Sequence, residues 1–266
     1  AIDVAKQLKA EIISADSRQC FKELNVGVAK PSTEELQQVR HYFINSHSVK
    51  EEVNAALFEK FALQTAEELF KKYDTVIMVG GTGLYIKAFC DGMDAIPAID
   101  EDIRSQLQKE YEEGGLPWLR QQLVLKDPLF AQQGEMQNPQ RMLRALEVMI
   151  VTGKSIIEFK TGKKQQRGFK IIKIGLDLPR EELYRRINHR VDEMMKAGLV
   201  DEAKQLLPIK QQNALQTVGY RELVEYFHGN CSMQQAVEKI KQNTRHYAKR
   251  QLTWFRKDPD LQWFPP

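Results

Sequence analysis

Two short apolar segments, each running into small or polar residues, constrain the fold of this chain most. Residues 75–79 read TVIMV and lead into the run Gly80, Gly81, Thr82 and Gly83, and residues 11–15 read EIISA and lead into Asp16. Both segments are too short for helices, which indicates buried strands. Because a parallel sheet presents functional groups at the carboxyl ends of its strands, they predict an α/β fold with a parallel sheet.

Bulk composition sets broad limits on the class of protein. The chain has 266 residues, of which 42% are hydrophobic, and its mean hydropathy is −0.49. No apolar run approaches 18 residues and no leader-like segment is present, so we expect a protein that neither crosses a membrane nor leaves the cytoplasm. The net charge is only +3, but basic residues cluster in residues 180–190 and 239–257, which suits a polyanionic partner.

Helical patterns surround the two predicted strands. An amphipathic pattern spans residues 51–72, and a strand pattern returns at 171–176, as another strand of the same sheet. Residues 98–140 have a helical sequence pattern that is interrupted by glycine and proline, and they contain no strand candidate. We therefore predict a core of residues 1–97 and 141–266 with a helical insertion at 98–140.

The candidate site residues each allow a structural interpretation. A strand-end aspartate such as Asp16 can be a turn former or helix cap, or it can be a general base or metal ligand. The glycine run around Thr82 can be a tight turn, or it can let backbone amides approach an anionic or planar ligand. Residues 153–155 end like a phosphate-binding loop but follow a helical pattern, so they indicate a helix stop.

Seven blocks of residues, taken together and in order, resemble the bacterial tRNA dimethylallyltransferases. They span nearly the whole chain: Asp16-Ser17-Arg18-Gln19, Gly27-Val28-Ala29-Lys30-Pro31, Gly80-Gly81-Thr82-Gly83-Leu84-Tyr85, Asn138-Pro139-Gln140-Arg141 with Arg144-Ala145-Leu146-Glu147-Val148, Arg186-Ile187-Asn188 with Arg190-Val191-Asp192, Val218-Gly219-Tyr220-Arg221, and Lys249-Arg250-Gln251 with Trp254.

This resemblance implies a core similar to that of P-loop kinases and a helical insertion that grips the anticodon stem-loop of tRNA. It implies transfer of a dimethylallyl group from dimethylallyl diphosphate, with Mg²⁺, to the N6 amine of the adenosine immediately 3′ of the anticodon. Asp16 would be the general base, Thr82 would contact the reacting adenosine, and Arg221 is our candidate for stabilising the departing diphosphate. The implied tRNA-contacting residues are Asp16, Ser17, Arg18, Gln19, Thr82, Arg104, Gln140, Arg141, Met142, Leu143, Arg144, Gln216, Thr217, Val218, Gly219, Tyr220 and Arg221.

The sequence also departs from the family pattern. The family's phosphate-binding loop is expected immediately before the helix that begins the chain, and it is missing from these residues. Cys20, Phe21 and Val28 replace the residues more usual at those positions. The alternatives are a small-molecule P-loop kinase, favoured by the parallel sheet alone, and a non-catalytic RNA-binding module, for which the basic C-terminal helix would suffice. We expect a cytoplasmic monomer that binds tRNA.

Overall fold

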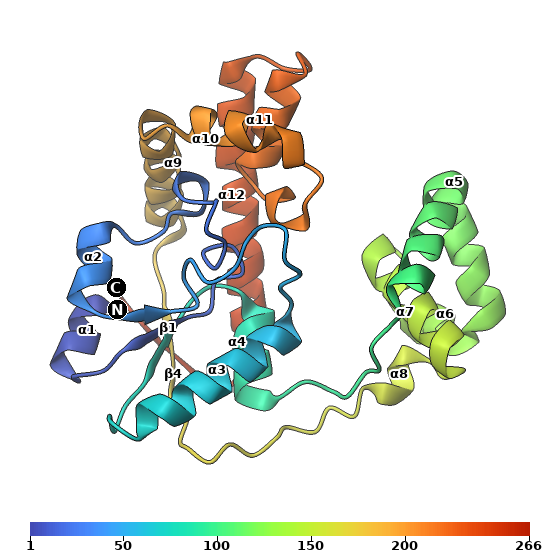
Figure 1. Ribbon diagram of the computed structural model, residues 1–266, viewed down its shortest axis with the longest axis horizontal. Coiled ribbons are helices and arrows are strands. Elements are labelled where there is room, and N and C mark those ends of the chain that lie inside the picture. The colour runs from blue at the N-terminus through green and yellow to red at the C-terminus, as the bar shows by residue number, and fades with distance from the viewer. The chain divides into compact units, whose positions relative to one another are not determined.

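A computed structural model describes all residues from 1 to 266, and it confirms the predicted α/β class. The chain divides into two compact units, which are described separately (Figure 1). One unit combines residues 1–90 with 167–266, and the other is residues 91–166. The division differs from the predicted insertion at 98–140, because the helix that follows residue 138 packs on the preceding helix of the insertion rather than on the sheet.

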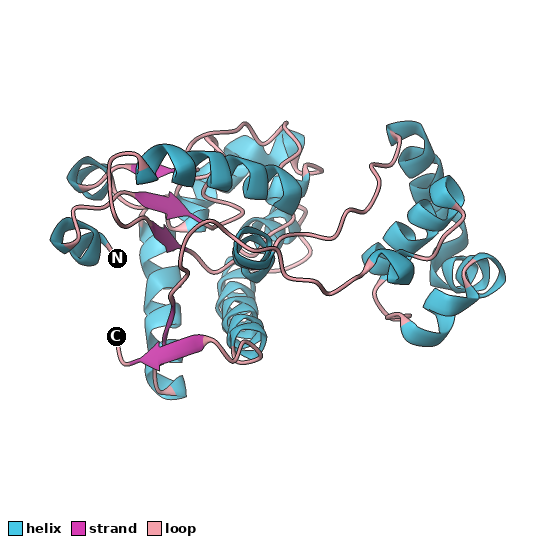
Figure 2. Cartoon of the chain, turned by 90° about the horizontal axis from the view of Figure 1, so that it is seen from below, coloured by secondary structure: helices cyan, strands magenta, loops and turns pink.

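The sheet of the first unit has three parallel strands in the order β2, β1, β3 (Figure 2). The central strand β1 (Ile12–Ser14) pairs with β3 (Ile77–Val79) and with β2 (His41–Tyr42), in a register that places Ile13 opposite Met78. All three residues of β1 are buried, as expected of a strand covered on both faces. Because the strands are parallel, their carboxyl ends share one edge.

Helices pack around this sheet through apolar faces. They are α1 (Ile2–Gln7), α3 (Ala55–Phe70) and α4 (Gly83–Asp91). The short helix α2 (Thr33–Gln38) has no buried residue, and a 3₁₀ turn, η1, spans Val26–Val28. Phe58 of α3 stacks on Tyr85 of α4 with ring centroids 4.5 Å apart, and Phe43 meets Phe58 edge-on at 5.0 Å. This aromatic cluster joins α3 and α4 and so fixes the helix that follows the glycine turn.

The predicted strand at 171–176 does form, but not in the predicted sheet. It is β4 (Lys173–Leu176), and it pairs in parallel with β5 (Leu261–Phe264) as a separate two-stranded sheet (Figure 2). Its partner comes from the end of the chain, where the sequence carried no strand prediction. Ile174 and Leu176 remain more than 60% exposed, so β4 lacks the double-sided cover that the three-stranded sheet has.

The remainder of the first unit is helical, as predicted. It comprises α9 (Arg180–Lys196), α10 (Leu199–Leu206), η2 (Leu207–Ile209), η3 (Asn213–Leu215), α11 (Tyr220–Phe227) and the long α12 (Met233–Phe255). Ser232 and Gln235 form a reciprocal capping box that satisfies free amides at the start of α12. Helices α9 and α11 pack on α12, which therefore organises this half of the unit.

The second unit is a helical bundle with its own core. It contains α5 (Glu101–Lys126), α6 (Pro128–Gln133), α7 (Pro139–Thr152) and α8 (Ile156–Phe159). Leu119, Leu123 and Leu146 are completely buried between α5 and α7. Gly153 ends α7 in the left-handed conformation, with φ of 68°, so the predicted helix stop is confirmed. No helix in either unit has the length and apolar content needed to cross a bilayer.

Candidate active site at the carboxyl edge of the sheet

The carboxylate of Asp16 closes a tight turn two residues beyond β1. Its Oδ1 accepts hydrogen bonds from the backbone amides of Arg18 at 2.8 Å and Gln19 at 3.2 Å. This is the turn-forming role that aspartate often plays. However, Oδ2 has no hydrogen-bond partner in the protein, and the side chain is only half-buried. One oxygen is therefore fixed by the backbone, while the other is available to a ligand.

Thr82 lies directly beside this turn. Its Oγ1 accepts from the backbone amide of Ser17 at 3.0 Å and lies 3.3 Å from the Ser17 hydroxyl, to which it donates. The amide of Thr82 also donates to the carbonyl of Ala15 at 3.2 Å. Three hydrogen bonds thus join the ends of β1 and β3, and the predicted proximity of Asp16 and Thr82 is a feature of the structure.

The glycine run serves this close approach of two backbones. A Cβ atom on Gly80 would lie 2.3 Å from the carbonyl oxygen of Ala15, a distance that real side chains do not tolerate. Gly80 is therefore needed for β1 and β3 to end together. Of the two interpretations offered by the sequence, the structural one holds at Gly80, and it is also what places Thr82 against Ser17.

Helix α12 covers the glycine turn with side chains spaced at one and two helical turns. Gln251 donates from Nε2 to the carbonyl of Gly81 at 2.9 Å, and a Cβ on Gly83 would lie 2.3 Å from the indole nitrogen of Trp254. Tyr247 lies one turn earlier, at 43% exposure. The sequence analysis missed this arrangement, because the basic and aromatic residues of α12 gave no sign of which element they would face.

The charged and polar groups of the site affect the pKa of Tyr247. Burial of its phenol raises the pKa of Tyr247, and the negative charge of Asp16 raises it further, whereas the charge of Arg18 and a hydrogen bond with Thr82 lower it. The phenol thus stays protonated at neutral pH and can donate a hydrogen bond at the edge of the site.

Gln19 connects the aspartate turn to the loop that follows. Its Nε2 donates to the carbonyls of Val28 and Ala29, at 3.3 and 3.0 Å, and its Oε1 accepts from the hydroxyl of Ser14 at 3.3 Å. Every polar atom of the amide is used within the protein. Its position beside Asp16 is therefore held from two directions.

Several of the residues expected to contact tRNA have a structural role in the second unit. Met142 is completely buried and Leu143 is 9% exposed, so these side chains belong to the core. Arg144 bonds Glu147 at 3.1 Å and the carbonyl of Pro97 at 3.3 Å, and Arg104 lies 3.9 Å from the other oxygen of Glu147. Two arginines thus compensate one buried carboxylate, a structural requirement that helical spacing does not reveal.

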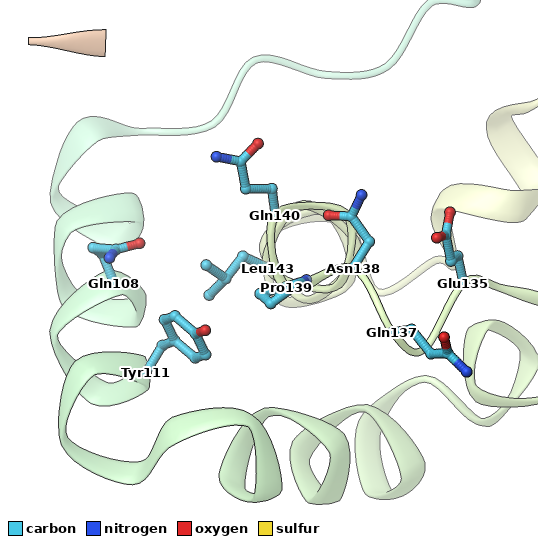
Figure 3. A pocket seen from close by; sticks show the side chains of 8 residues that line it. All are labelled: Gln108, Tyr111, Glu135, Gln137, Asn138, Pro139, Gln140 and Leu143. Atoms are coloured by element: carbon cyan, nitrogen blue, oxygen red, sulfur yellow. The ribbon is translucent and has the colours of Figure 1, made fainter. Parts of the chain in front are cut away.

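Gln140 and Arg141 are exposed at the start of α7. Gln140 lines a hollow of about 670 Å³ in the second unit, across from Gln108 and Tyr111 of α5 (Figure 3). Arg141 is paired with the exposed Glu135. Amide groups and a tyrosine ring line this hollow, which is a suitable surface for hydrogen bonding and stacking with a polar planar group.

The predicted residues 216–221 run from the end of η3 to the start of α11 in the first unit. Gln216 and Arg221 line a hollow of about 750 Å³ bordered by α11 and α12, together with Lys210 and Lys239. Gly219 has φ of 100°, which only glycine adopts readily, and Tyr220 is 2% exposed. Thr217 accepts a backbone bond from Arg221, and Val218 is half-buried, so the exposed members of this segment are Gln216 and Arg221.

The side chains of the chain do not assemble a metal centre. No group of three or more histidine, cysteine, aspartate or glutamate residues is placed to hold a metal ion. Asp16 stands without a second carboxylate beside it, and one of its oxygens already accepts two backbone bonds. The residues present therefore do not fit a dedicated cage of protein ligands for Mg²⁺.

Comparison with known protein families gives one clear match. The model of the family described as IPP transferase matches residues 19–258. The tRNA dimethylallyltransferase of Christiangramia forsetii is 48% identical over 264 residues, which are 99% of this chain and 87% of that protein. The protein of the same name from Cytophaga hutchinsonii is 47% identical over 266 residues, covering 100% of this chain and 88% of the relative.

Solved structures agree with the sequence relatives. The full-length tRNA isopentenylpyrophosphate transferase of Bacillus halodurans has a TM-score of 0.72 and 35% identity, covering 99% of this chain and 84% of that one. A eukaryotic dimethylallyltransferase acting on tRNA has a TM-score of 0.81 and 25% identity, covering 98% of this chain and 69% of that one. The similarity thus extends over both compact units.

Proposed function

The chain belongs to the IPP transferase family, and we propose that it transfers a dimethylallyl group from dimethylallyl diphosphate to the N6 amine of the adenosine immediately 3′ of the anticodon in tRNA. The products are N6-isopentenyladenosine and diphosphate. Its class follows from the relatives: it is a tRNA-modifying prenyltransferase, and neither a small-molecule kinase nor a non-catalytic RNA-binding module.

The observation that carries the proposal is the carboxylate of Asp16, with one oxygen fixed by the backbone and the other open beside Ser17 and Thr82. An adenine exocyclic amine is a weak nucleophile because its lone pair is delocalised into the ring. A carboxylate that removes its proton as the C–N bond forms supports the reaction by about 10²–10⁴-fold. Asp16 Oδ2 is in our proposal that base, and the hydroxyl of Thr82 orients the purine.

The second requirement is stabilisation of the departing diphosphate. Its developing negative charge favours cationic side chains that are already in position. We assign this role to Arg221, which is exposed in the hollow bordered by α11 and α12. Mg²⁺ enters the proposal as the counter-ion that arrives with the diphosphate and partly neutralises its charge.

The tRNA partner would be held by its anticodon stem-loop. The target base must leave its stack, at a cost of a few kcal/mol, and this cost is lower in a loop than in a duplex. In our proposal the exposed candidates Gln140, Arg141, Gln216 and Arg221 contact the RNA, together with the half-buried Arg18. Arg104, Met142, Leu143 and Arg144 also belong to the proposed tRNA path, and they stabilise the helices that carry the exposed contacts. The protein would work as a monomer in the cytoplasm, where its substrate tRNA is found.

One assay tests the reaction directly. The protein is incubated with dimethylallyl diphosphate labelled in the prenyl group, Mg²⁺ and tRNA that lacks the modification. We expect label in the tRNA, at the adenosine next to the anticodon, and none in a tRNA whose corresponding base is not adenosine. ATP-dependent phosphorylation of a small molecule without any transfer to tRNA would contradict the proposal.

A further inference from the structure

The carboxylate of Glu202, on α10, accepts four hydrogen bonds, three of them from a distant part of the chain. Its Oε2 accepts from the backbone amides of Asn25 at 3.0 Å and Val26 at 2.9 Å. Its Oε1 accepts from the amide of Gly27 at 2.9 Å and from the hydroxyl of Tyr220 at 2.6 Å. Three consecutive amides at the start of η1 are thus satisfied by one side chain, which fixes the position of that turn.

Tyr220 contacts both Glu202 and the loop that Glu202 holds. Its ring fills the space beside Gly27, where an added Cβ would lie 2.6 Å from the ring. Burial raises the pKa of the Tyr220 phenol, and its hydrogen bond to Glu202 acts in the same direction, so the hydroxyl remains a donor. Glu202 and Tyr220 therefore form one clamp on residues 25–27.

The clamped loop continues to the active-site turn. The carbonyls of Val28 and Ala29, the residues that follow the clamp, accept both hydrogen bonds from the side-chain amide of Gln19. The backbone amide of Gln19 in turn donates to Asp16 Oδ1. An unbroken series of hydrogen bonds and covalent bonds thus runs from Glu202 through the loop to Asp16.

We propose that Glu202 is a positioning residue for the transfer reaction, a role that rests on the proposed function. By fixing residues 25–29 it holds Gln19, and through Gln19 it holds the turn that aims Asp16 Oδ2 at the substrate amine. In this role Glu202 acts through the loop and Gln19, and not by contact with a substrate. A misplacement of a catalytic group by about 1 Å can reduce turnover by about 10²-fold, so the clamp affects the chemical step more than binding.

The substitution Glu202→Gln in the full chain tests this role. Glutamine keeps the shape of the side chain, but it has one acceptor oxygen and places an amide N–H₂ group against backbone donors, so at least one side of the clamp opens. We expect kcat to fall by about tenfold or more while KM for tRNA and for dimethylallyl diphosphate stays within about threefold. Hydrogen exchange of the amides of residues 25–27 should accelerate in the same variant.

Two further variants make the test specific. Asp201→Asn removes the neighbouring carboxylate, which is exposed on the same helix, and kcat should stay within about twofold of the original. Tyr220→Phe keeps the ring against Gly27 and removes only its hydroxyl. We expect a smaller loss of kcat than in Glu202→Gln, again without a matching change in KM. If Glu202→Gln does not fold, this variant provides the same test.

The outcomes are distinguishable. An unaltered kcat in a folded Glu202→Gln variant, or in Tyr220→Phe when the former does not fold, would overturn the positioning role and leave the proposed function intact. A loss of kcat that is proportional to the fraction of unfolded protein in the variant would also overturn the positioning role and leave the proposed function intact. Absence of prenyl transfer by the unsubstituted protein would overturn both.

Discussion

Asp16 shows how one residue can satisfy both of its possible interpretations. As a turn former it uses Oδ1 to bind two backbone amides, and as a candidate base it keeps Oδ2 free. The turn costs the side chain its rotational freedom, which is an advantage for a catalytic group because the free oxygen is already oriented. The structural role is thus what prepares the proposed catalytic one.

The substitution Asp16→Asn separates these two roles. The amide oxygen of asparagine can still accept from Arg18 and Gln19, so the turn remains, but the neutral side chain cannot take a proton. We expect tRNA affinity within a few fold of the original and single-turnover transfer slower by about 10²-fold or more. Asp74→Asn, at an exposed position before β3, serves as the control. Equal transfer rates in the two variants would reject Asp16 as the base.

Gly80 carries a prediction about stability. In Gly80→Ala the new methyl group would collide with the backbone carbonyl of Ala15, which cannot move without disturbing β1. We expect a loss of about 1–3 kcal/mol in the free energy of unfolding, measured by urea denaturation, together with reduced transfer activity. Gly168→Ala is the matched control, since nothing lies within 4 Å of an added Cβ there. Equal stability of the two variants would show that β1 and β3 do not need this close approach.

At the scale of elements, the long helices and the two buried strands β1 and β3 could be predicted, whereas β2, β5 and the partner of β4 could not. Helices such as α12 repeat their apolar pattern over many turns and begin at a recognisable capping box. By contrast, β2 has two residues and β5 carries no signal of its partner, because a strand is defined by pairing with distant residues. For the same reason, the sequence analysis placed β4 in the larger sheet, whereas it pairs with β5.

The long helix α5 contains a break that only glycine can make. Gly115 has φ of 64° and ψ of −165°, a region essentially closed to other residues, and Pro117 follows it. We expect Gly115→Ala to lower the free energy of unfolding of the second unit by about 1–3 kcal/mol, observed by circular dichroism during denaturation. Glu113→Ala, at an exposed helical position, should change it by less than about 0.5 kcal/mol. If Gly115→Ala leaves the free energy of unfolding unchanged, α5 is a continuous helix in solution.

At the scale of the whole molecule, buried acidic protons predict alkaline sensitivity. Burial is the main cause that raises the pKa of five side chains. It raises the pKa of the Cys20 thiol from 9.0 to about 12. The five residues are Cys20, Tyr42, Tyr85, Tyr220 and Tyr247. Since the folded state holds these protons more tightly than the unfolded state, their contribution to stability is complete below about pH 9 and is lost as the pH rises toward 12.

We therefore expect the free energy of unfolding to decrease continuously from about pH 9 upward. Urea denaturation at several alkaline pH values measures the decrease. Cys20→Ser removes one of the titrating groups, so its stability should decline less steeply over the same range even if it starts lower. Stability that is constant or increasing between pH 9 and 12 would contradict the folded-state protonation of these groups.

The sequence by itself determined the parallel α/β class, the helical course of the chain and the pairing of Asp16 with Thr82 at one edge of a sheet. These follow from local patterns, since the carboxyl ends of neighbouring parallel strands lie at the same edge of the sheet. Only the tertiary structure decided that Glu202 clamps the loop beside Gln19, that Arg144 serves Glu147, and where the two units divide. Those features depend on contacts between residues far apart in the chain, as with the 177 positions that separate Asn25 from Glu202, and no local pattern encodes them.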